Sequence, residues 1–247
     1  MKALIFAAGL GSRLRPLTDN TPKALIPIGG KPMLEHVILK LKASGFNEIV
    51  INIHHHGQQI IDYLERNENF GLDIHISDER DCLLDTGGGI KHARKFLDGN
   101  EPFLVHNADI LSNVDLKQLY QAACHSSGTI ATLLVSERES SRCLLFDKEN
   151  QLQGWQNRET GEVKSPHSNF RASLYKGYAF SGIHVISPKI FEWMDQQWEG
   201  KFSIINFYLA VCAKTNIEAY PMDNLQLLDI GKPEALAKAE EWLKEIK

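Results

Sequence analysis

The sequence has little of what marks several common classes of protein. It contains four cysteines and no C-x-x-C pair, so we expect neither a disulfide framework nor a cysteine metal site. No apolar run approaches the length of about 18 residues that a membrane-spanning helix needs. The formal net charge of −4 gives no general attraction to nucleic acid or to an acidic membrane. We also find no Ser-His-Asp or Cys-His set that would indicate nucleophilic catalysis.

The first residues carry no recognisable secretory signal, because Met1, Lys2 and Ala3 lead directly into a short apolar run. Together with the cysteine usage, which fits a reducing compartment, this predicts a soluble cytoplasmic protein. The length of 247 residues and the 43% of hydrophobic residues are enough for one large domain with its own core. No internal repeat or convincing linker interrupts the chain.

What the sequence does contain is a stretch rich in glycine and cations at residues 7–31, which follows a predicted strand at 3–6. Gly9 and Gly11 let the backbone turn sharply and approach a ligand closely. The stretch therefore predicts a binding loop for a polyphosphate. Three cations in it can donate charge-assisted hydrogen bonds to phosphate, namely Arg13, Arg15 and Lys23.

Two well-known phosphate loops do not fit this stretch. A Walker A loop is excluded because no Gly-Lys-Ser/Thr follows the glycines. A dinucleotide fingerprint needs a third glycine at position 14, which is Leu14. A bare glycine-rich turn with solvated cations is the plainer alternative.

Strand and helix patterns then alternate with short links, which predicts an α/β fold with a Rossmann-like, mixed but mostly parallel sheet wound by right-handed crossovers. Ligands of such sheets bind beyond the carboxyl ends of the strands, where the opening loop, a turn at Thr86–Gly89 and Asp109 are expected. The predicted strands of the first half are 3–6, 48–53, 72–77, 102–106 and 129–135, and the helices are 33–41, 59–66, one from the Thr86–Gly89 turn to about 97, and 115–125.

The pattern changes after about residue 137. Residues 142–147 and 151–155 predict a hairpin, and the polar segment 157–175 predicts a flexible or functional loop. The remaining predicted elements are strands at 178–186, 217–220 and 225–229, and helices at 188–196, 204–213 and 233–244.

Two aspartates stand at predicted strand ends, Asp109 after an apolar strand and Asp229 after two leucines. Mg²⁺ takes one or two carboxylates and leaves its other positions to phosphate oxygens and water, so this pair fits a magnesium site. Strand-end aspartates are also common as helix caps or turn residues. Three adjacent histidines, His54 to His56, cannot all point one way, so we expect them to mark the end of a strand.

The complete pattern Gly-x-Gly-x-Arg-x-x-Pro-x-Thr, followed by Pro-Lys and Pro27, resembles the signature of the sugar-1-phosphate nucleotidylyltransferases. The resemblance implies the GT-A-like fold of nucleotide-diphospho-sugar transferases. It also implies transfer of a nucleoside monophosphate from an NTP to a sugar-1-phosphate, with Mg²⁺ as cofactor. Residues 1–247 would form a single domain, with a nucleotide-binding portion at 1–136 and a sugar-phosphate-binding portion at 137–247.

Roles for individual residues follow from the same resemblance. Arg13 would grip the β- and γ-phosphates, Lys23 would contact the α-phosphate and the sugar phosphate, and Asp109 would complete the catalytic set and, with Asp229, bind the metal. Family members commonly have glycine before the first aspartate, and the methyl group of Ala108 here would crowd the metal side slightly. The implied nucleotide-binding residues are Ala8, Gly9, Gly11, Ser12, Arg13, Lys23, Thr86 and Gly87, and the implied sugar-phosphate-binding residues are Asn107 and Gly182.

Within this family, the triple glycine after Thr86, the run Phe180–Ile183 and the compact length look most like the N-acetylmuramate-1-phosphate uridylyltransferases of cell-wall recycling. The polar segment 157–175 is longer than in those enzymes, so guanylyltransferases for mannose- or heptose-1-phosphate remain alternatives. The opening motif also resembles phosphocholine cytidylyltransferases, although the triple glycine favours a sugar phosphate. A non-catalytic nucleotide-sugar sensor is the alternative of another class. We expect no nucleic-acid or membrane partner and a monomer or small homo-oligomer.

Overall fold

The computed structural model describes residues 1–231 and 233–245, and it divides into two compact units. The first unit comprises Met1–Leu83, Val105–Leu116 and Gln226–Lys247, and the second comprises Leu84–Leu104 and Lys117–Leu225. The expectation of a single domain stays a prediction.

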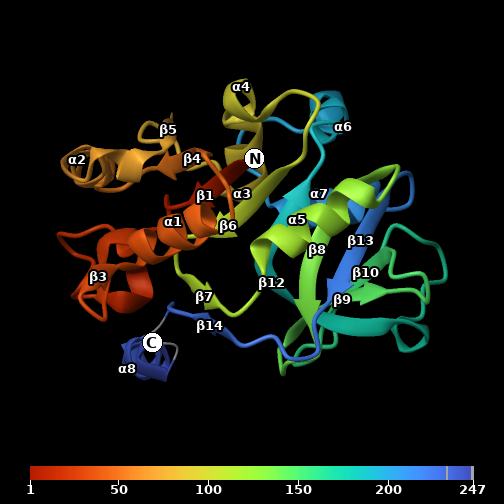
Figure 1. Cartoon of the computed structure of the whole chain (residues 1–247). Coiled ribbons are helices and arrows are strands. Elements are labelled where there is room, and N and C mark those ends of the chain that lie inside the picture. The colour runs from red at the N-terminus through yellow and green to blue at the C-terminus, as the bar shows by residue number, and fades with distance from the viewer. Residues whose placement is uncertain (232, 246–247) are drawn as a thin grey trace. The chain divides into compact units, whose positions relative to one another are not determined.

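The first unit is built on three parallel strands, β1 (Lys2–Phe6), β4 (Glu48–Ile53) and β5 (Asp73–Asp78) (Figure 1). Helix α1 (Met33–Ala43) connects β1 to β4, and its apolar residues at helical spacing are the ones that are buried. Helix α2 (Gly57–Arg66) connects β4 to β5. The predicted α/β alternation and parallel pairing are therefore confirmed in this unit.

A short antiparallel pair that the sequence did not predict lies in the same unit (Figure 1). Strand β6 (Phe103–Asn107) enters the unit and turns at residues 108–109 into β7 (Ile110–Ser112), which pairs with β14 (Leu227–Asp229). The pairing matters because it brings a segment near the end of the chain next to the β6–β7 turn. The remaining short elements of this unit are η1 (Ser12–Leu14), η2 (Lys23–Leu25), β2 (Pro27–Ile28), β3 (Lys31–Pro32) and η3 (Glu68–Gly71).

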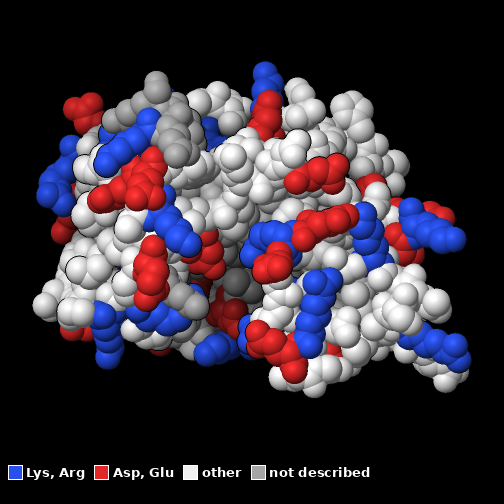
Figure 2. All heavy atoms as spheres, turned by 90° about the horizontal axis from the view of Figure 1, so that it is seen from below, with Lys and Arg blue, Asp and Glu red and all other residues white. Residues whose placement is uncertain are grey.

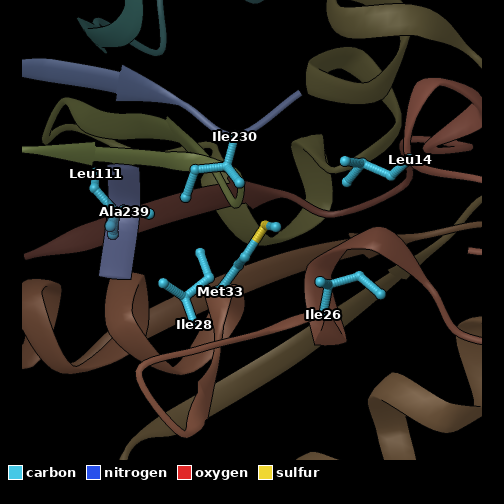
Figure 3. Packing of buried hydrophobic residues seen from close by; sticks show 7 residues of the cluster. All are labelled: Leu14, Ile26, Ile28, Met33, Leu111, Ile230 and Ala239. Carbon is cyan, nitrogen blue, oxygen red and sulfur yellow. The ribbon is translucent and has the colours of Figure 1, made fainter. Parts of the chain in front are cut away.

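The last helix, α8 (Pro233–Glu245), packs on the loop at the start of the chain through a shared apolar cluster. Figure 3 shows Met33 of α1 and Ile230 pointing toward one another, with Leu14 of η1 in the same group. Burial of these side chains removes apolar surface from water and ties the first and last segments of this unit together. The buried members are Leu14, Ile26, Ile28, Met33, Leu111, Ile230 and Ala239, and Leu228, Leu236, Trp242 and Leu243 pack against them.

The second unit is mainly antiparallel, which the sequence predicted only for the hairpin. Strand β12 (Lys176–Ile186) pairs antiparallel with both β8 (Thr129–Ser136) and β9 (Arg142–Phe146), and β9 pairs with β10 (Leu152–Asn157). Strand β13 (Asn216–Pro221) pairs parallel with β8, so the fold as a whole is mixed. The helices of this unit are α3 (Asp85–His92), α4 (Arg94–Leu97), α5 (Leu116–His125), α6 (Ile190–Gln197) and α7 (Ile204–Val211).

Residues 157–175, the expected flexible or functional loop, carry short regular elements. They contain β11 (Val163–Lys164), which pairs with β10, and the short helix η4 (Ala172–Leu174). The Phe170 ring stacks on Tyr175 with 4.5 Å between centroids and lies where a Cβ on Gly154 would fall. Lys164 lies 5.0 Å from the Trp155 ring centroid. Aromatic packing on β10, which the polar sequence does not reveal, therefore holds this segment.

The charged side chains on the face seen in Figure 2 are of both signs and lie interspersed, in keeping with the small net charge. None of the helices in the described part of the chain is long and apolar enough to cross a membrane.

A buried histidine in the second unit predicts how stability depends on pH. Burial lowers the pKa of His184 from 6.5 to about 3, and its Nδ1 lies 2.9 Å from the hydroxyl oxygen of buried Tyr208. Between pH 6 and 4 the unfolded chain therefore binds a proton that the folded chain does not, so the free energy of unfolding falls as the pH falls. The contribution of one such group is about 1.4 kcal/mol per pH unit.

Urea denaturation at pH 7, 6 and 5 checks this prediction with His184→Gln and with the exposed His125→Gln as control. The His184 variant should lose stability less steeply on acidification than the wild type, and the His125 variant should follow the wild type. Parallel curves for all three proteins would contradict it.

Candidate active site

The opening loop turns where Gly11 adopts a left-handed backbone conformation, with φ at 63°. A Cβ there would lie 2.8 Å from Cγ2 of Thr18, so both the conformation and the space require glycine. The Thr18 hydroxyl and the Leu14 N–H both donate to the Gly11 carbonyl oxygen, each at 2.8 Å. The loop is thus fixed at Gly11, while Gly9, Ser12 and Arg13 remain exposed.

Lys23 and Asp109 form an ion pair, Nζ to Oδ2, although they are 86 positions apart in the sequence. Lys23 begins η2 directly after Pro22, and Asp109 lies in the β6–β7 turn. Their side chains are only 12% and 22% exposed, so the pair is partly shielded from water. The structure therefore brings together two residues that the family resemblance placed in one site.

Asp229 lies next to the same turn because β14 pairs with β7. Asp229 is opposite Ile110 in the register, and the N–H of Ile230 donates to the carbonyl oxygen of Asp109 at 2.8 Å. Two aspartates that are 120 positions apart in the sequence are thus adjacent on a two-stranded ribbon. This pairing therefore brings the backbone of Asp229 next to that of Asp109.

Arg13 joins this group from the loop. A Cβ on Gly231 would lie 2.6 Å from an Arg13 guanidinium nitrogen and 2.8 Å from Asp229 Oδ1, so both groups face the backbone of Gly231. The same residues line a cavity of about 300 Å³ together with the first turns of α8. Other residues of this lining are Leu228, Glu234, Ala235 and Lys238.

The donor set of this site fits Mg²⁺. Asp109 and Asp229 offer hard carboxylate oxygens, and Mg²⁺ characteristically takes one or two of them and fills its other positions with phosphate oxygens and water. Across residues 1–231 and 233–245, no three His, Cys, Asp or Glu side chains gather as a metal-binding group. Two carboxylates beside two cations suit a metal that arrives together with a polyphosphate.

Asn107 and Ala108 lead into the turn that carries Asp109. Asn107 ends β6, and the N–H of buried Ala108 donates to the Phe6 carbonyl oxygen at 3.0 Å, which joins the turn to the end of β1. His106, the residue before Asn107 in β6, is fully buried, and burial lowers the pKa of its ring from 6.5 to about 4. This histidine is therefore neutral near pH 7 and adds no charge beside the aspartate.

The three histidines lie at the end of β4, as expected. His54 Nδ1 is 2.7 Å from the Glu79 carbonyl oxygen, and His56 Nε2 is 3.1 Å from the Asp19 carbonyl oxygen. Gln59 of α2 also donates to the Asn20 carbonyl oxygen at 2.9 Å. These contacts attach the far side of the opening loop to the start of α2.

Three predicted site residues belong to the second unit. Thr86 and Gly87 lie in the first turn of α3, so the expected glycine turn before a helix is wrong and the glycines are helical. The Thr86 hydroxyl accepts from the N–H of Ile204, and the N–H of Gly87 donates to the Phe202 carbonyl oxygen at 2.9 Å. Gly182, with φ at 77°, lies at an irregularity of β12. Their contact with substrate stays a prediction.

The triple glycine has a packing reason that predicts a stability effect. A Cβ on Gly88 would lie 2.3 Å from the Gly200 carbonyl oxygen, a backbone atom that cannot move aside alone. We expect Gly88→Ala to lower the free energy of unfolding by about 1–3 kcal/mol through overpacking. Urea denaturation checks this, with Gly9→Ala as control because a Cβ there meets no atom within 4 Å. Equal stability of the two variants would contradict the packing explanation.

The fold and the site define a class of protein, namely an α/β protein in which a glycine-rich loop with cations and two aspartates on neighbouring segments lie in one unit. Residues 2–245 match the family model described as Nucleotidyl transferase, and the chain belongs to this family.

Known proteins similar to the chain agree with this assignment. The chain is 36% identical over 194 residues to an N-acetylmuramate alpha-1-phosphate uridylyltransferase of Neisseria meningitidis, covering 78% of each protein. It is 31% identical to the protein of the same name in Caulobacter vibrioides, covering 98% of this chain and 97% of that one. The crystal structure of HddC from Yersinia pseudotuberculosis complexed with GMP-PN is similar with a TM-score of 0.76 and 25% identity, covering 98% and 99% of the two chains. The family and the fold expected from the opening motif are therefore confirmed.

Proposed function

We propose that the chain transfers a nucleoside monophosphate from an NTP to a sugar-1-phosphate and releases pyrophosphate, with UTP and N-acetylmuramate-1-phosphate as the substrates. The observation that carries the proposal is the grouping of Arg13, Lys23, Asp109 and Asp229 in one unit of a nucleotidyl transferase. The two uridylyltransferase relatives support this choice of base and sugar.

The chemistry needs positioning and charge neutralisation more than proton transfer. A sugar phosphate oxygen, already anionic, attacks the α-phosphorus, and the bond from that phosphorus to the β-phosphate bridging oxygen breaks as pyrophosphate leaves. No general base is required, which agrees with a site made of cations and carboxylates. Lys23 is suited to the charge near the α-phosphate, and Arg13 to the leaving pyrophosphate.

Asp109 and Asp229 would hold Mg²⁺, which when bound neutralises triphosphate charge. Lys23 is the partner of Asp109 in the present structure, so an incoming phosphate and cation would separate this pair and give each member an oppositely charged ligand.

Two alternatives stay open. The second candidate is GTP with mannose- or heptose-1-phosphate, and the GMP-PN in the similar structure of HddC supports its choice of base. A non-catalytic nucleotide-sugar sensor would need neither aspartate nor Lys23, and all three are present.

A pyrophosphate-release assay tests these candidates together. Each of the four NTPs is combined with N-acetylmuramate-, mannose-, heptose- and glucose-1-phosphate, with Mg²⁺ or with EDTA. We expect turnover with UTP and N-acetylmuramate-1-phosphate that EDTA abolishes. Turnover only with GTP would establish the second candidate, and nucleotide-sugar binding without any turnover would establish the sensor.

A further inference from the structure

Two hydrogen-bonded, buried polar side chains support the start of the opening loop, and the sequence motif does not include them. Asn52, 2% exposed, lies at the end of β4, where the register places it opposite Phe6, the last residue of β1. Its side-chain oxygen accepts from the backbone N–H groups of Ala7 at 2.7 Å and Ala8 at 3.2 Å. Its side-chain nitrogen donates to Oε1 of Glu79 at 2.8 Å.

The hydrogen-bond partners at the two ends of the Asn52 amide allow only one orientation of the amide group. Backbone N–H groups can only donate, so they need an acceptor, and the carboxyl oxygen Oε1 of Glu79 accepts from the amide nitrogen. The amide therefore has to present its oxygen to Ala7 and Ala8 and its nitrogen to Glu79. Glu79, also 2% exposed, is itself held because its N–H donates to the Ile53 carbonyl oxygen at 2.9 Å.

We propose that Asn52 is a positioning residue for the phosphate loop and that Glu79 fixes its orientation. Ala7 and Ala8 are the two residues through which the chain leaves β1 and enters the loop, and both are buried. Two adjacent N–H groups on one acceptor fix two successive peptide planes, Phe6–Ala7 and Ala7–Ala8, and the next peptide, Ala8–Gly9, starts the loop from this fixed position. The proposal rests on the proposed function, because positioning is judged by how the loop serves a nucleotide.

The Asn52–Glu79 pair can be tested with variants that exchange the hydrogen-bond donor and acceptor roles of the two side chains. Asn52→Asp keeps an acceptor for Ala7 and Ala8 but sets one carboxylate against another in a buried place. The repulsion is relieved while the two share a proton and returns when that proton is lost at higher pH. Glu79→Gln added to this variant restores a donor, because the amide nitrogen introduced at position 79 can donate to the carboxylate introduced at position 52.

Titratable and charged groups lie close to the pair in the sequence. The ring nitrogen Nδ1 of His54, the residue after β4, lies 2.7 Å from the backbone carbonyl oxygen of Glu79. Asp78 and Arg80, the neighbours of Glu79, form an ion pair with each other at 2.5 Å. These three residues are unchanged in every variant, so the differences between the variants arise from the changes at positions 52 and 79.

The experiment measures kcat and KM for UTP between pH 6 and 8.5 in the wild type, N52D, E79Q and N52D/E79Q, with exposed Asn67→Asp as control. We expect N52D to lose about tenfold in kcat/KM as the pH rises, equal to about 1.4 kcal/mol, while the double variant and N67D follow the wild-type profile. Thermal melting at each pH separates this change from unfolding. Parallel profiles for N52D and the wild type, or no rescue in the double variant, would overturn the proposal.

Amide hydrogen exchange at Ala7 and Ala8, followed by NMR without substrate, gives a second readout. Exchange at both amides should be at least about tenfold faster in N52D at pH 8 than in the double variant after correction for intrinsic rates. This measurement does not depend on turnover, so a failure of the proposed function leaves it valid. Equal protection of the two amides in all variants would overturn the positioning role by itself.

Discussion

Asp109→Asn is expected to lower turnover by at least about a hundredfold, equal to about 3 kcal/mol of transition-state stabilisation. The substitution keeps the size of the side chain and removes the charge that faces Lys23. The site then keeps one carboxylate, Asp229, for a divalent cation. Stimulation by Mg²⁺ should consequently require a higher concentration of the metal.

Steady-state kinetics at increasing Mg²⁺, together with thermal melting, checks this prediction. The control is Asp73→Asn in the same unit, whose side chain is 69% exposed, and it should retain wild-type kinetics. The fold of the Asp109 variant should be intact, because an amide oxygen can still accept from Lys23. Near-normal turnover of Asp109→Asn with unchanged metal dependence would remove Asp109 from the metal site.

Leu14→Ala should lower the free energy of unfolding by about 2–5 kcal/mol, as is typical for removal of a fully buried leucine side chain. Leu14 is 0% exposed and belongs to the cluster in which Ala239 and Leu236 of α8 pack near Ile230. It also follows Arg13 directly, so the cavity left behind should loosen the phosphate loop. We therefore expect a raised KM for the nucleotide as well.

Urea denaturation and nucleotide kinetics of Leu14→Ala and Leu10→Ala distinguish the loss of a buried side chain from a change of sequence in the loop. Both leucines belong to the same loop, but Leu10 is 50% exposed and should change stability by no more than about 0.5 kcal/mol. Similar stability losses in the two variants would contradict the role of α8 as a support for the loop.

Much of the fold could be predicted because local pattern and tertiary setting agree. In the first unit, short apolar runs became the buried parallel strands β1 and β4, and the spacing of apolar residues in α1 matched its buried face. The second unit was less predictable. Its antiparallel pairing depends on register between distant strands, and the sequence of each strand alone does not encode that register.

The candidate site likewise contains residues that the sequence could predict and contacts that it could not. A residue motif identified Gly11, Arg13 and Lys23, since phosphate binding needs those residue types at close spacing. The pairing of β7 with β14, which places Asp229 beside Asp109, could not be predicted because each strand has only three residues. The triple glycine was misread as a turn, because glycine is uncommon inside helices unless another backbone approaches closely, as Gly200 does here.

The sequence by itself determined which chemical groups the proposed site can offer, namely a glycine-rich loop with cations suited to phosphate and two carboxylates suited to a divalent cation. It did so because those properties belong to residue types and short spacings. The tertiary structure alone decided that Lys23 pairs with Asp109 and that α8 packs against the loop. It also decided that Asn52 holds the first two residues of the loop. These contacts join segments far apart in the chain, and only the packed core and the strand register set the distances between them.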